Sequence, residues 1–125
     1  MVRSFLRVGS VLVLMLFLAV AAASEVLIDG VYDEVGDSSS FMIFAQDGDV
    51  IHAMGYWVSN GSPCVWFGEG KRSGNTFSYS FRYSIGKSYS GTHTWMISPD
   101  GRTLTGTWKT SDGRSGSASL KKRSI

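Results

Sequence analysis

The chain has 125 residues, 43% of them hydrophobic, which is the size of one domain. It carries 12 Lys and Arg against 10 Asp and Glu, and Arg3 and Arg7 lie in an N-terminal leader, so the remainder is close to neutral. Near-zero charge disfavours a cationic nucleic-acid-binding protein, and the 13% of aromatic residues argues against intrinsic disorder.

The first 23 residues have the three parts of a secretory signal peptide. Arg3 and Arg7 supply the positive start, an apolar run follows, and residues 21–23 are alanines suited to cleavage. The apolar run is shorter than the roughly 20 residues that span a bilayer, and no cysteine lies near the cleavage site for lipidation. We therefore expect residues 1–23 to be a cleaved signal peptide. Residues 24–125 should form one secreted or periplasmic domain without a stable membrane span.

Turn-forming pairs such as Asp-Gly and Asn-Gly recur at intervals of about 10–14 residues, which leaves room for one short strand between turns. Residues 76–85 show the clearest alternation, with aromatic side chains facing opposite to serines and Arg82, so we expect Phe81 to point inward. The apolar face of this segment comprises Phe77, Tyr79, Phe81, Tyr83 and Ile85. The predicted strands are 30–35, 40–46, 50–59, 64–71, 76–85, 92–98, 104–110 and 116–121.

Every predicted connection is short, so successive strands should be antiparallel neighbours. Eight such strands can remain an open sheet or close on themselves, and closure removes the exposed edges. We predict an all-β fold, an eight-stranded antiparallel up-and-down meander closed into a small β-barrel. A sandwich or half-open roll is the alternative. An outer-membrane barrel fits less well, because several segments are shorter than the about 9–11 residues such strands need.

The charges are unevenly distributed along the chain. Residues 25–70 hold eight acids and no base, whereas residues 71–125 hold ten bases and two acids. We expect the negative charges of the first half to pair with the positive charges of the second half where the two meet in the barrel. The alternative is a surface with one acidic and one basic side that orients a partner.

The sequence contains no pattern typical of a catalytic or metal site. His52 and His93 lack a metal-ligand spacing, and we expect both to be satisfied within strands. No Gly-x-Ser-x-Gly elbow occurs, and no helix follows the glycine-rich segments to bind phosphate. The single cysteine, Cys64, lies in an apolar stretch and should be a small buried hydrophobe, a reactive thiol or an intermolecular bridge being the alternatives. We expect a protein that is not an enzyme and uses no cofactor or metal.

Short glycine and aromatic patterns resemble the calycins, the group that includes lipocalins and avidins. The Gly-Val-Tyr step at 30–32 resembles the opening of their first strand, and the segment around Trp95 resembles the seventh strand of avidin-like proteins. The resemblance implies a barrel open at one end, in which the hydroxyls of Ser39 or Ser40 and Tyr56 would face a ligand. Avidin-like proteins place an acid in their last strand, and this chain has none there, so biotin is not implied.

Export of a small barrel without a catalytic pattern suggests a carrier. We expect it to bind a small, partly apolar ligand through Ser39, Ser40 and Tyr56, with Trp95 as an aromatic wall. The alternative is an interaction or inhibitor module with a filled core, which would contact a secreted protein partner through its turns and rim aromatics. The candidate rim aromatics are Trp57, Trp66 and Tyr89. An open cavity of about 300 Å³ would favour the ligand-binding hypothesis. The sequence leaves the oligomeric state open.

Overall fold

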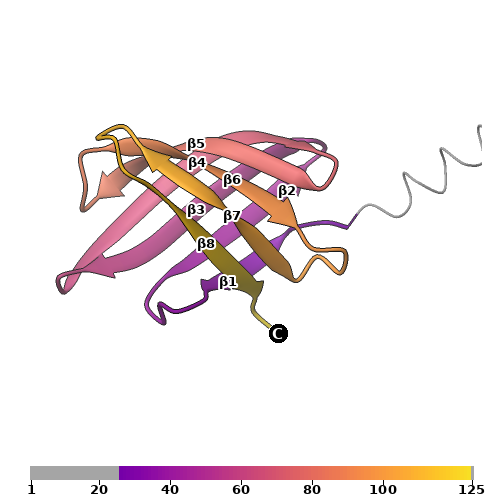
Figure 1. The fold of residues 1–125 in the computed structure, drawn as a ribbon, viewed down its shortest axis with the longest axis horizontal. Coiled ribbons are helices and arrows are strands. Elements are labelled where there is room, and N and C mark those ends of the chain that lie inside the picture. Colours follow the sequence, from indigo (N-terminus) through magenta and orange to yellow (C-terminus); the bar gives the residue numbers. More distant parts are fainter. Residues whose placement is uncertain (1–25, 125) are drawn as a thin grey trace, which may run out of the picture.

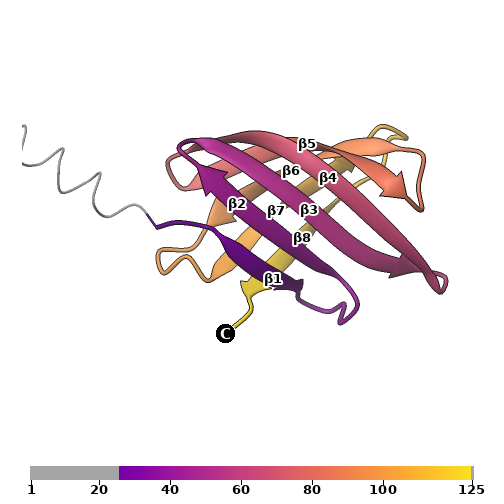
Figure 2. The ribbon, with the colours of Figure 1, turned by 180° about the vertical axis from the view of Figure 1, so that it is seen from behind.

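The computed structural model describes residues 26–124, and all their regular secondary structure is β-strand. Eight antiparallel strands follow one another around the structure, and the first pairs with the last to close a barrel (Figures 1 and 2). The predicted barrel is confirmed, and the sandwich alternative is wrong. The predicted signal peptide lies outside the described residues. The strands are β1 (Gly30–Glu34), β2 (Phe41–Asp47), β3 (Val50–Ser59), β4 (Ser62–Ser73), β5 (Thr76–Ile85), β6 (Ser90–Ile97), β7 (Thr103–Thr110) and β8 (Ser115–Lys122).

The predicted alternation of β5 is confirmed over most of its length. Phe77, Tyr79 and Phe81 are buried, whereas the serines between them are exposed. The exception is Ile85, which is 55% exposed. A β-bulge shifts the register between β4 and β5, so that Tyr83 lies opposite Trp66 but Ile85 lies opposite Val65. An extra residue reverses the alternation beyond it, which turns Ile85 to the outside.

The two ends of the barrel differ. The β1–β2, β3–β4, β5–β6 and β7–β8 loops lie at one end, which we call the mouth. The other three loops and both ends of the described chain lie at the opposite end, the base (Figure 1). No helix within residues 26–124 has the length and apolar character needed to cross a membrane.

The base is closed by packed side chains and by the segment that precedes β1. Ile28 of this segment is fully buried. Arg72 Nη1 donates to the carbonyl oxygen of Val26 and to Gln46 Oε1, the latter at 2.9 Å. Tyr32 Oη donates to the carbonyl oxygen of Gly101 at 3.3 Å, and burial raises the pKa of Tyr32 to about 12. The interior at this end is therefore filled.

Oppositely charged residues meet where the barrel closes. Arg123, just after β8, lies 2.6 Å from an Asp33 carboxylate oxygen on β1. The hydrogen bond from Arg123 lowers the pKa of Asp33. Both side chains are exposed, and exposed pairs contribute little to stability. This contact is an instance of the complementarity expected between the acidic and basic halves.

Candidate functional site: an aromatic cavity at the mouth

A cavity of about 290 Å³ lies inside the barrel at its mouth. Its wall is mostly aromatic and includes all four tryptophans of the chain. Polar side chains, among them Ser40, Glu34 and Asp37, complete the lining. The aromatic and imidazole rings are Trp57, Trp66, Phe81, Tyr83, Tyr89, His93, Trp95 and Trp108.

Gly55 of β3 allows Trp66 of β4 to lie across the interior. The two residues are cross-strand partners, and Gly55 is buried. A Cβ atom at this position would be 2.1 Å from Trp66 Cε2, far closer than van der Waals contact. The glycine therefore sets the position of one cavity wall.

Gly55→Ala should lower the free energy of unfolding by about 1–3 kcal/mol, because the indole of Trp66 must move within a packed interior. Urea denaturation monitored by circular dichroism measures the change. The tryptophan emission spectrum of the folded variant should also differ from that of the wild type. A variant with unchanged stability and emission would contradict the close approach of Trp66 to β3.

Three buried side chains form a hydrogen-bonded chain beside the cavity. Trp95 Nε1 donates to Tyr79 Oη at 3.0 Å, and Tyr79 Oη lies 2.7 Å from His93 Nδ1. An indole N–H can only donate, and Met42 Sδ, 3.9 Å from Tyr79 Oη, is a weak acceptor, so we assign the single hydrogen of the hydroxyl to Nδ1. Burial lowers the pKa of His93 to about 3, so the imidazole is neutral and carries its proton on Nε2. The prediction that His93 is satisfied within its strand is confirmed at Nδ1.

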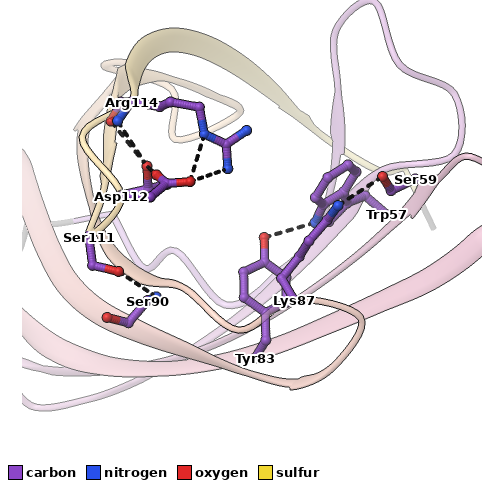
Figure 3. Close-up of polar contacts among 9 residues, drawn as sticks. Trp57, Ser59, Tyr83, Lys87, Ser90, Ser111, Asp112 and Arg114 are labelled. Atoms are coloured by element: carbon purple, nitrogen blue, oxygen red, sulfur yellow. Dashed lines mark hydrogen bonds and ion pairs between the residues drawn. The ribbon is translucent and has the colours of Figure 1, made fainter.

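Polar contacts hold the loops around the mouth (Figure 3). Trp57 Nε1 donates to Tyr83 Oη at 3.0 Å, and burial raises the pKa of Tyr83. On the β7–β8 loop, Arg114 pairs with Asp112 at 2.9 Å, and its guanidinium lies 4.7 Å from the centroid of the Tyr89 ring. The rim is thus built from residues that already have partners.

The structure brings together two of the four predicted ligand-contacting residues. Ser40 and Trp95 are 5% and 1% exposed and both line the cavity. Ser39 lies outside it, and its backbone N–H and hydroxyl both donate to Asp37 Oδ1, at 3.0 and 2.8 Å. Tyr56 also lies outside, because Gly55 takes the inward position and its neighbour faces out. There the ring of Tyr56 stacks on Phe41 at 5.3 Å.

Other sequence expectations have mixed outcomes. Cys64 is 1% exposed, as predicted for a small buried hydrophobe. Trp66 is 2% exposed, so the expectation that it is a rim aromatic is wrong. His93, which was not predicted as a site residue, also lines the cavity, and it lies on the same inward face of β6 as Trp95. His52 is on the outer surface. Among residues 26–124, no three His, Cys, Asp or Glu side chains are placed to hold a metal ion.

Besides a depression of about 380 Å³ that includes Thr105 and Ser117, two larger hollows lie on the outside of the barrel. One, of about 870 Å³, is bordered by outward-facing side chains that include His52, Arg82 and Lys109. The other, of about 640 Å³, lies beside the base and includes Met96 and Pro99. Both are depressions of the outer surface, whereas the mouth cavity lies between the strands and opens to solvent at the mouth.

Comparisons with known proteins support the fold alone. No protein-family profile matches the chain. No curated protein matches it either. Among solved structures, the chain is similar to a protein described as "a redesigned beta barrel", with a TM-score of 0.64 and 17% sequence identity. The match covers 78% of this chain and 92% of that one, so the shared feature is the barrel.

Proposed function

We propose that this protein is an exported, non-catalytic β-barrel that binds a small, partly apolar molecule in the mouth cavity. The observation that carries the proposal is the aromatic-lined cavity of about 290 Å³ inside the barrel. Ligand sites usually have volumes of about 300–1,000 Å³, so the cavity suits a small molecule. The signal-peptide pattern of residues 1–23 supports export.

The chemistry of the lining supports the same proposal. Binding sites for small molecules combine apolar and aromatic walls with a few polar groups that orient the ligand. Here the buried Ser40 hydroxyl and the His93 imidazole are such groups. The filled base and open mouth also agree with the resemblance to calycins, whose barrels hold ligands in their interiors.

The competing proposal is an interaction or inhibitor module that contacts a secreted protein through its rim. Val35, beside the β1–β2 loop, is 64% exposed, and Ile85, beside the β5–β6 loop, is 55% exposed. These apolar side chains could contribute to such a contact. A variant that blocks the cavity but leaves the rim unchanged distinguishes the two proposals, because only ligand binding in the cavity should be lost.

Ala118→Phe is the variant that blocks the cavity. Ala118 of β8 lines the cavity, and its neighbour Ser117 is exposed on the outer face. The protein is titrated with a panel of lipids, vitamins and aromatic metabolites while tryptophan fluorescence is recorded. For any compound that binds the wild type, Ala118→Phe should weaken binding by about tenfold or more, or about 1.4 kcal/mol.

Ser117→Phe adds the same ring on the opposite face of the same strand and should leave the affinity unchanged. A compound that binds Ala118→Phe as tightly as the wild type would have its site outside the cavity. If no compound in the panel changes the fluorescence, the interaction-module proposal gains support at the expense of ligand binding.

A further inference from the structure

We propose that the ligand is a neutral, planar ring compound that presents a hydrogen-bond acceptor, such as a carbonyl oxygen or a ring nitrogen, to the side-chain N–H groups of Trp66 and His93. This inference rests on the proposed function and adds the chemical class of the ligand. These two N–H groups have no hydrogen-bond acceptor among the described residues, and a ligand of this class would supply one.

Trp66 provides the first donor. An indole N–H can donate but not accept, and no described residue accepts a hydrogen bond from Trp66 Nε1. In residues 26–124, every side-chain nitrogen or oxygen that is sealed from solvent has a hydrogen-bond partner. Trp66 Nε1 therefore borders accessible space. Because Trp66 is 2% exposed and lines the cavity, that space is the cavity.

His93 provides the second donor by the same reasoning. Its Nδ1 accepts from Tyr79, which leaves the proton on Nε2, and no described residue bonds to Nε2. His93 is 7% exposed and lines the cavity, so Nε2–H also faces into it. The rings of Trp66 and His93 are perpendicular neighbours with centroids 5.0 Å apart, so both donors lie in one part of the wall.

The charges around the cavity select a neutral ligand. Among the described residues that line the cavity, only Glu34, Asp37 and Arg114 at the rim are charged, so an anion buried deeper would lack a counter-charge. At the rim, Arg114 is already paired with Asp112, and the acidic Glu34 and Asp37 also line the opening. These carboxylates repel anions that approach the mouth, and the nearby cation Lys87 is held by Ser59 and by the ring of Trp57. A neutral acceptor therefore fits better than a carboxylate or phosphate.

The shape of the wall selects a planar ligand. Trp57 is fixed by its hydrogen bond to Tyr83, and Trp66 packs against the rings of Tyr79 and Phe81, at centroid distances of 5.6 and 5.2 Å. Fixed aromatic rings favour stacked or edge-to-face contact with another ring. A volume of about 290 Å³ limits the ligand to a small ring system.

Quinoline and naphthalene are the probes that test this inference. They have nearly the same size and shape, but only quinoline has a ring nitrogen that accepts a hydrogen bond. Both are titrated into wild type and His93→Phe, and binding is followed through the indole N–H signals in NMR spectra. Because naphthalene is more apolar, the two absolute affinities cannot be compared directly. The deciding quantity is the ratio of the affinity for quinoline to that for naphthalene, compared between wild type and His93→Phe as in a double-mutant cycle.

We expect this ratio to fall by about tenfold in His93→Phe, the effect of losing one well-placed hydrogen bond to a buried donor. Quinoline should also shift the indole N–H signal of Trp66, assigned with Trp66→Phe, further downfield than naphthalene does. His52→Phe, which makes the same exchange on the outer face, should keep the wild-type ratio. An unchanged ratio in His93→Phe would overturn the inference.

A second measurement does not depend on any variant folding. Long-range ¹H–¹⁵N NMR spectra of the wild type should show the Nε2–H tautomer of His93. Observation of the Nδ1–H tautomer would overturn the inference. Binding of both probes with the same ratio in wild type and His93→Phe would leave the proposed function intact and reject only the acceptor requirement. Failure of both probes to bind would count against the cavity as a ligand site.

Discussion

Phe44→Ala is expected to lower the free energy of unfolding by about 3–5 kcal/mol, the usual cost of deleting a buried phenyl ring. Phe44 of β2 is 2% exposed. Its ring contacts Tyr32 and Phe77 edge-on, at centroid distances of 5.4 and 5.3 Å. All three lie toward the filled base, where the surrounding side chains cannot easily collapse into the space left behind.

Phe81→Ala should cost less than Phe44→Ala, although Phe81 is 3% exposed. Phe81 borders the mouth cavity, so its removal enlarges a space that water can already enter. Ser80→Ala, on the exposed face of the same strand, should change stability by less than about 0.5 kcal/mol. Urea denaturation of the three variants gives the comparison. If Phe44→Ala and Phe81→Ala lower the free energy of unfolding equally, the mouth is packed as tightly as the base.

Periodicity and turn chemistry were sufficient to predict the barrel. The apolar residues of 76–85 alternate with polar ones, so their inward face could be read directly, and β3 and β5 have the predicted bounds. The faces of β3 could not be assigned so easily, because residues 50–59 are almost uniformly apolar. Only the pairing of the strands places Gly55 inside and Tyr56 outside.

The cavity could not be predicted from the sequence for a related reason. Alternating aromatic residues can fill a barrel or leave it hollow, and the outcome depends on how the rings pack. Here Ala118 contributes little side-chain volume to the cavity lining, and Gly55 lets the indole of Trp66 lie against β3, whereas the base is filled by large side chains. The bulge that turns Ile85 outward likewise depends on the β4–β5 register, and no local pattern marks it.

Acidification should destabilise the fold through His93. Its pKa is lowered from 6.5 to about 3 by burial, so between these values the unfolded chain takes up a proton that the folded chain does not. The stability that comes from keeping His93 neutral is fully present above pH 6.5 and is lost as the pH falls toward 3. Well below pH 6.5 each pH unit corresponds to about 1.4 kcal/mol, and near pH 6.5 to about half of that, so the loss on going from pH 6.5 to roughly 4.5 should be about 2 kcal/mol.

Carboxylates also weaken the fold in acid, so the contribution of His93 must be isolated. Asp33, Asp100 and Asp112 have lowered pKa values because of their hydrogen bonds to neighbouring groups, and their stabilisation is lost as they become protonated. His93→Gln removes the titrating imidazole but keeps an amide that can donate and accept. Urea denaturation at pH 6.5 and at roughly pH 4.5 should show a loss of stability that is about 2 kcal/mol smaller in His93→Gln than in wild type. His52→Gln, which replaces the exposed histidine of β3, should retain the wild-type loss. If His93→Gln loses as much stability on acidification as the wild type, burial does not keep the imidazole neutral. His93 would then be protonated in the folded protein as readily as in the unfolded chain.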